Sequence, residues 1–66
     1  MMFAIIPNLT RKNAAQVTRL ICAKLDELGA AYSLPLSAEN VFSNTKAEFL
    51  PEKELIGGCE AVITVG

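Results

Sequence analysis

The sequence predicts a small α/β fold of the Rossmann-like, three-layer type, built on a parallel sheet. Two continuously apolar runs, at residues 2–6 and 61–65, are typical of strands that are buried on both faces of such a sheet. Between them, residues 12–28 follow the period of an amphipathic helix. Strand-like and helix-like segments therefore alternate along the chain, and this alternation predicts parallel strands joined by right-handed crossovers.

The composition fits one small domain that leaves apolar surface uncovered. The chain has 66 residues, of which 52% are hydrophobic and 20% are charged. This is too apolar for a disordered chain and rich for an isolated domain of this length. We interpret the excess as surface that faces a partner or a further part of a longer protein.

Charge and cysteine content exclude several classes of function. The net charge of −1 favours neither nucleic acid nor an anionic membrane as a partner. We find no apolar run long enough to span a membrane and no signal-peptide pattern. Two cysteines, Cys22 and Cys59, without any histidine do not make a zinc site. A disulfide is possible by count alone, but a reduced cytoplasmic protein is the simplest interpretation.

The first half of the chain predicts a strand, a long helix and a second strand. Pro7 ends the first strand, and Thr10 is expected to cap the helix over residues 12–28, which Gly29 ends. The second strand, at residues 30–36, contains Pro35 and is therefore expected at an edge of the sheet. The helical stripe expected to face the core consists of Ala14, Val17, Thr18, Ile21, Leu25 and Leu28.

The second half predicts one short helix and a last strand. Ser37 is a candidate cap for a helical turn through Val41, and residues 46–50 are either a loop or a brief strand. Pro51 opens a short helix that ends at residues 57–58, and the third strand follows at residues 61–65. Because the first and third strands are the most apolar, we expect them to be neighbours. The predicted sheet has three parallel strands in the order 2-1-3, with one long and one short helix.

In this order the connections leave the first strand in opposite directions, which makes a crevice at the carboxyl ends of strands 1 and 3. Asn8, Thr10 and Gly66 are expected there. An amide, a hydroxyl and the free N–H groups of a helix N-terminus make a usable phosphate site, to which Arg11 and Lys12 add positive charge. The same loop also has a purely structural interpretation, which the loop alone favours. In it, Thr10 is a helix cap, Asn8 is a turn residue and the two cations are solvated.

No complete set of catalytic residues is present in the chain. Two acids on the long helix and two at the start of the short helix are interpreted as solvated side chains: Asp26, Glu27, Glu52 and Glu54. The two cysteines are interpreted as packing residues rather than nucleophiles.

Three stretches of the chain resemble the start of an NAD kinase of the ATP-NAD kinase and inorganic polyphosphate-ATP-NAD kinase family. Residues 3–8, Phe-Ala-Ile-Ile-Pro-Asn, resemble the first strand and its asparagine-containing turn. Residues 17–30 resemble the first helix and the Gly-Ala entry to the second strand. Residues 50–66 resemble the approach to the family's Gly-Gly-Asp-Gly motif. One departure is that Leu9 follows Asn8, where many related kinases have proline.

The resemblance implies a parent enzyme that transfers the γ-phosphoryl group of ATP to the ribose 2′-hydroxyl of NAD, which gives NADP. It implies ATP and NAD as ligands and a divalent metal such as Mg²⁺ on the phosphates. Gly66 would be the first glycine of the motif, and Asn8, Thr10 and Gly66 would bind nucleotide. We therefore expect residues 1–66 to be the N-terminal part of a nucleotide-binding domain. The catalytic aspartate and the C-terminal, β-rich NAD-binding domain lie outside it, so this fragment should be inactive and hold no cofactor.

A second hypothesis treats the chain as a small non-catalytic α/β module that binds a partner and dimerises. One long and one short helix cannot cover both faces of so apolar a sheet, and a second copy would supply the missing layer. We therefore expect a homo-oligomer.

Overall fold

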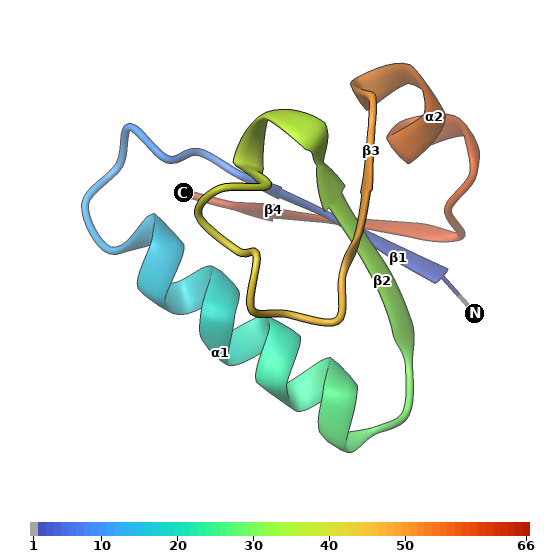
Figure 1. The fold of residues 1–66 in the computed structure, drawn as a ribbon, viewed down its shortest axis with the longest axis horizontal. Coiled ribbons are helices and arrows are strands. Elements are labelled where there is room, and N and C mark those ends of the chain that lie inside the picture. The colour runs from blue at the N-terminus through green and yellow to red at the C-terminus, as the bar shows by residue number, and fades with distance from the viewer. Residues whose placement is uncertain (1) are drawn as a thin grey trace.

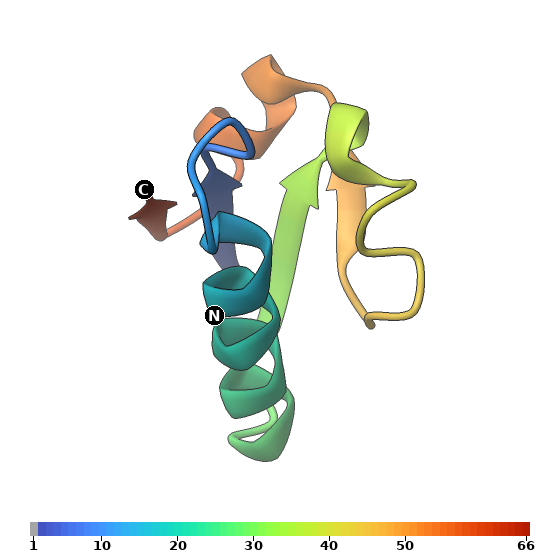
Figure 2. The ribbon, with the colours of Figure 1, turned by 90° about the vertical axis from the view of Figure 1, so that its left-hand side faces the viewer.

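The computed structural model describes residues 2–66 and shows a small α/β fold on a parallel sheet (Figure 1). Within these residues the sheet has four strands in the order β3-β2-β1-β4, every neighbouring pair being parallel. Figure 2 shows β1, β2 and β3 pointing the same way. The elements, in chain order, are β1 (Met2–Pro7), α1 (Ala14–Glu27), β2 (Ala31–Pro35), the 3₁₀ turn η1 (Leu36–Ala38), β3 (Glu48–Leu50), α2 (Glu52–Gly57) and β4 (Ala61–Val65).

The two helices lie on opposite sides of the sheet (Figure 1). The connection from β1 through α1 to β2 moves across the sheet in one direction, and the connection from β3 through α2 to β4 moves in the other. Right-handed crossovers in opposite directions must cover opposite faces. The main core lies on the α1 side, where Ile5 and Leu34 of the sheet pack with Phe42 of the loop after η1. Leu55 of α2 is fully buried outside this cluster.

The prediction of three strands was wrong, because the segment at residues 46–50 contributes β3. β3 pairs with β2 in the register Ser33↔Glu48 to Pro35↔Leu50, so β2 is an inner strand and not an edge strand. Pro35 is compatible with this position because β2 pairs with β1 only from Ala31 to Ser33. The missing N–H of Pro35 thus lies beyond the β1–β2 ladder, where no bond is lost. The predicted neighbours of β1 are confirmed: β2 lies on one side and β4 on the other.

Helix α1 is shorter than the predicted range of residues 12–28, and its buried face is rotated. Val17 and Leu28 were expected in the core, but they are 42% and 66% exposed. Ile21 is half-buried, and Cys22, which was expected at the flank, is fully buried. The side chains that face the sheet are mostly small and let the helix approach closely; they are Ala14, Thr18, Cys22 and Leu25. The buried Thr18 hydroxyl is satisfied because it donates to the carbonyl of Ala14 at 2.7 Å.

The predicted glycine end of the helix is confirmed. Gly29 has φ +70°, the left-handed conformation that glycine adopts without steric cost. Its N–H donates to the Asp26 carbonyl, and the N–H of Ala30 donates to the Leu25 carbonyl. These two bonds form a Schellman motif, which satisfies the last carbonyls of α1 and turns the chain into β2.

Leu25→Ala is expected to lower the free energy of unfolding by about 2–5 kcal/mol, because it removes a buried side chain and leaves a cavity against the sheet. The matched control is Leu20→Ala on the same helix, since Leu20 is 66% exposed whereas Leu25 is 7% exposed. The control should change stability by less than about 0.5 kcal/mol. Denaturant unfolding followed by circular dichroism measures both, and equal losses would contradict the assigned face.

Candidate functional site

The carboxyl ends of β1 and β4 lie side by side and bring together the turn after β1 and Gly66. The backbone N–H of Asn8 donates to the carbonyl of Val65 at 2.8 Å, which extends the ladder beyond Pro7. A Cβ atom placed on Gly66 would lie 3.0 Å from the Cβ of Asn8 and 3.2 Å from the Cγ of Arg11. With φ +107°, Gly66 also has a backbone conformation that other residues rarely adopt. A side chain at position 66 would therefore displace the turn.

Asn8 and Thr10 form one hydrogen-bonded turn. The side-chain oxygen Oδ1 of Asn8 accepts from the hydroxyl of Thr10 at 2.6 Å and from its backbone N–H at 3.3 Å. The turn role of Asn8 is confirmed, whereas the expected role of Thr10 as the helix cap was wrong. Because both bonds use Oδ1, the side-chain amide nitrogen Nδ2 of this exposed asparagine has no protein acceptor within residues 2–66. This nitrogen remains a donor for a ligand at the surface.

The residue that begins α1 is Asn13, which sequence reasoning missed. Its backbone is left-handed, with φ 72°, and its carbonyl accepts the first helical bond from Val17 at 2.9 Å. Asparagine tolerates this conformation better than most residues. An asparagine directly before the apolar helical pattern was the available signal, but Thr10 offers a similar one. Among the described residues no side chain caps the start of α1, and its first turn contains no acid.

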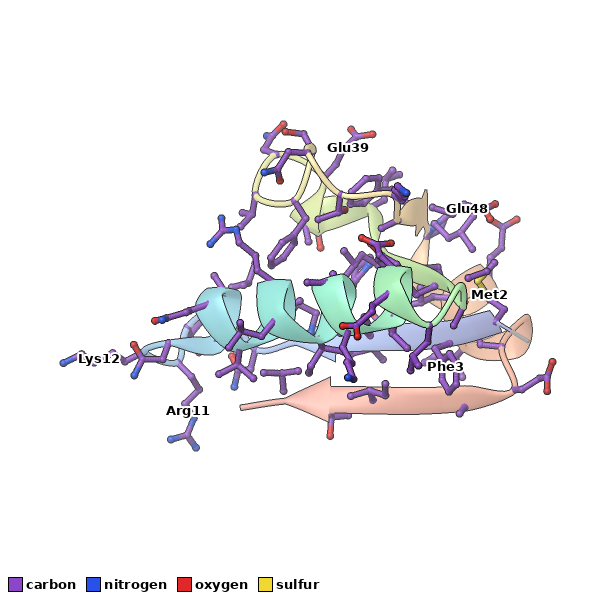
Figure 3. The ribbon with its side chains drawn as sticks, turned by 90° about the horizontal axis from the view of Figure 1, so that it is seen from below. Met2, Phe3, Arg11, Lys12, Glu39 and Glu48 are labelled. Carbon is purple, nitrogen blue, oxygen red and sulfur yellow. The ribbon has the colours of Figure 1, made fainter. Side chains whose placement is uncertain are left out.

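Positive charge gathers at this end of the sheet. Arg11 and Lys12 are exposed, and Figure 3 shows both side chains extending away from the body of the protein near the start of α1. Residues 8–18 contain no acidic side chain. The positive end of the α1 dipole adds to the field of the two cations. The candidate phosphate edge, by which we mean Asn8, Thr10, Arg11, Lys12 and Gly66, is therefore suited to an anion.

A separate cavity of about 330 Å³ lies at the other end of α1. Its walls include Asp26, Lys46 and Glu48 together with Tyr32, whose hydroxyl is buried without a hydrogen-bond partner in residues 2–66. Burial raises the pKa of Tyr32 to about 12. None of the residues expected at the nucleotide site borders this cavity.

Cys22 and Cys59 are both free thiols in this structure. Burial raises the pKa of Cys22, so its thiol stays protonated and is a poor nucleophile. Cys59 lies near Ser33, with 3.4 Å between Sγ and Oγ. In the described part of the chain, no group of three or more Cys, Asp or Glu side chains is placed to hold a metal ion. None of the helices described is both long and apolar enough to cross a membrane.

Comparisons of the chain with protein-family models, with curated proteins and with solved structures found no significant match.

Asn13→Gly is expected to preserve or raise stability, and Asn13→Ala to lower it. The left-handed backbone costs a residue with a Cβ roughly 1–2 kcal/mol, a cost that glycine avoids and asparagine partly offsets by local hydrogen bonding. Alanine has the cost without the compensation. Thermal unfolding of the three proteins measures the order Gly ≥ Asn > Ala, and a stabilising alanine would contradict the assigned conformation.

Tyr32→Phe is expected to change stability at pH 7 by no more than about 1 kcal/mol, because the hydroxyl that it removes has no partner. The effect of the substitution on stability should appear at high pH. The folded pKa of about 12 exceeds the ordinary value of 10.0, so the neutral phenol favours folding below pH 10, and this contribution is lost as the pH rises toward 12. Denaturation between pH 9 and pH 12 should therefore show a steeper loss for the natural protein than for Tyr32→Phe; parallel curves would contradict the burial of this group.

Proposed function

We propose that residues 1–66 form the N-terminal part of the nucleotide-binding domain of a cytoplasmic NAD kinase. The parent enzyme would transfer the γ-phosphoryl group of ATP to the ribose 2′-hydroxyl of NAD. The observation that carries the proposal is the contact between the Asn8 turn and Gly66 at the carboxyl ends of adjacent parallel strands. Open α/β sheets bind ligands at such a switch point. The resemblance of residues 3–8, 17–30 and 50–66 to this family supports the same assignment.

Each residue of the candidate phosphate edge has a role in this proposal. Asn8 offers its free amide N–H₂ group to a phosphate oxygen, while Thr10 holds the opposite side of that amide in place. Arg11 and Lys12 offset the charge of the phosphates, and the start of α1 supplies unpaired N–H groups. Gly66 allows the backbone to come close to the ligand. The isolated fragment, which is expected to hold no cofactor, would contact added ATP only weakly through these groups and would not perform the transfer.

The residues of this edge fit the phosphates of ATP rather than a metal ion. They present donors and cations, and residues 2–66 contain no cluster of metal-binding side chains. A divalent ion such as Mg²⁺ would come to this edge together with the phosphates and would neutralise their charge during transfer. NAD and the catalytic aspartate would be bound and supplied by later parts of the parent. The proposed role of this fragment is thus to form one wall of the ATP site.

The second candidate function is a non-catalytic interaction module. The observation that favours it is the exposure of large apolar side chains on both α1 and β4, such as Val17, Leu20 and Val62. The coding sequence distinguishes the two candidates. Codons for Gly-Asp-Gly directly after Gly66 would support the kinase, and a stop codon at that point would support the module.

Asn8→Ala is expected to weaken the binding of ATP to this chain on the order of tenfold, because it removes a hydrogen bond to a charged phosphate. A titration of isotope-labelled protein with ATP and Mg²⁺ measures this by NMR. Shifts should centre on the amides of residues 8–13 and on Gly66. Asn44→Ala is the matched control, since Asn44 is also an exposed asparagine but lies in the loop before β3.

In a parent enzyme that includes the Gly-Asp-Gly segment, Asn8→Ala should raise the KM for ATP or lower kcat, with little loss of stability. Unchanged kinetics for ATP and NAD would mean that the turn is structural. The fragment alone should form no NADP from ATP, NAD and Mg²⁺. Any NADP above the blank would contradict the proposal that later parts of the parent bind NAD and supply the catalytic aspartate.

A further inference from the structure

Within the part of the chain that the structure describes, the outer edge of β4 is open. Within residues 2–66, β4 is paired with β1 along one edge, and no strand lies along its other edge. Its sequence, Ala-Val-Ile-Thr-Val, contains neither charge nor proline. Natural sheet edges are usually guarded by lysine, proline or a bulge, because an open edge is a template for another strand. An edge without these devices is suited to pairing.

The register of the β1–β4 ladder determines which backbone groups face this edge. The carbonyl of Val65 accepts from the N–H of Asn8, so the N–H and C=O of Val65 point toward β1. Along a strand, successive residues point these groups to opposite sides. Val62 and Thr64 therefore present their N–H and C=O groups to the open edge. Both residues are exposed in this structure.

We propose that β4 pairs in antiparallel orientation with β4 of a second copy of this chain, about a two-fold axis at Ile63. In this register Val62 lies opposite Thr64 of the second copy, and each such pair exchanges two backbone hydrogen bonds. Ile63 lies opposite itself, and Ala61 lies opposite Val65. Every cross-strand pair is then apolar or joins an apolar residue to threonine, which is the kind of pair that stabilises sheets.

Charge complementarity selects the antiparallel orientation. Glu60 precedes β4 and is exposed, whereas Arg11 packs beside Gly66 at the other end of the strand. Figure 3 shows the Arg11 side chain extending past the carboxyl end of β4. In the antiparallel register Glu60 lies opposite Gly66 of the second copy, and so beside its Arg11. The two-fold axis makes this ion pair twice, whereas a parallel arrangement would place like charges together.

Such a dimer joins two sheets into one continuous sheet. The interface consists of one strand from each copy, so it is smaller than the roughly 1,200–2,000 Å² typical of stable complexes. We therefore expect a weak and reversible dimer. The pairing does not require nucleotide binding by Asn8, so either proposal can fail without the other.

Sedimentation equilibrium of the chain over a concentration series tests the pairing through Thr64→Pro. Proline removes an N–H that faces the open edge but none that bonds to β1, so the monomer keeps its fold. The dissociation constant should rise at least about tenfold, because two symmetry-related backbone hydrogen bonds are lost. Thr64→Val is the control, since it keeps the shape and the N–H and should leave the dimer intact. A natural chain that stays monomeric at about 1 mM, or a Thr64→Pro dimer of unchanged affinity, would overturn the proposal.

A charge exchange tests the orientation. Arg11→Glu and Glu60→Arg, each alone, should raise the dissociation constant about fivefold at low salt, because each breaks two exposed ion pairs and creates repulsion. The double variant restores opposite charges across the interface and should return the dissociation constant to within about twofold of the natural value. Additive weakening in the double variant, or the formation of large aggregates that these charge substitutions do not affect, would overturn the antiparallel pairing. Circular dichroism of each variant confirms that the fold is retained.

Discussion

The parallel pairing of β1 with β4 is the interaction on which the rest of this structure depends. The ladder runs from Phe3↔Ala61 to Pro7↔Val65 and joins the two ends of the chain. It places β1 inside the sheet, where Ala4 and Ile5 are fully buried on opposite faces. Because side chains alternate along a strand, a shift of one residue would turn Ile63 and Val65 away from the α1 core. The buried face thus fixes the register.

The same register creates the candidate site. With Pro7 opposite Val65, the next residues in each strand, Asn8 and Gly66, necessarily meet. The turn between β1 and α1 then needs little else to hold it, since Asn8 binds Val65 through its backbone and Thr10 through its side chain. The candidate phosphate edge therefore depends on the ladder beneath it. It is made by long-range pairing and not by the loop alone.

Sequence patterns predicted those elements of the fold that are long enough to show a pattern. Residues 2–6 and 61–65 are continuous apolar runs, so their strands and their adjacency were predicted, and the site residues followed from that order. β3 has three residues and makes no periodic pattern of its own, so its pairing with β2 was not foreseen. The buried face of α1 was also mistaken in part. Periodicity allows several adjacent stripes, and the close approach permitted by small Ala14, Thr18 and Cys22 decides between them.

The details of the site could not be predicted for a different reason. Thr10 and Asn13 are both acceptable residues to begin a helix. Which of them does so depends on backbone dihedral angles that the local sequence does not determine. Once Thr10 is bonded to Asn8, its hydroxyl is no longer free to cap α1. Asn13 then begins the helix in a left-handed conformation. The contact of Arg11 with Gly66 depends on this turn as well, and no local pattern indicates it.

Arg11 connects the two proposals, because the same guanidinium lies at the candidate phosphate edge and at the end of the β4 edge. In an antiparallel dimer the carboxyl ends of the two β4 strands would point in opposite directions, so the two candidate phosphate edges would lie far apart and both would stay open. Each Arg11 would, however, be shared between a phosphate and Glu60 of the second copy. An anion bound at this edge would compete for that side chain and weaken pairing, and pairing would weaken anion binding by the same factor. The extent of this coupling is limited by the exposed position of both charges, which keeps each ion pair worth less than about 1 kcal/mol.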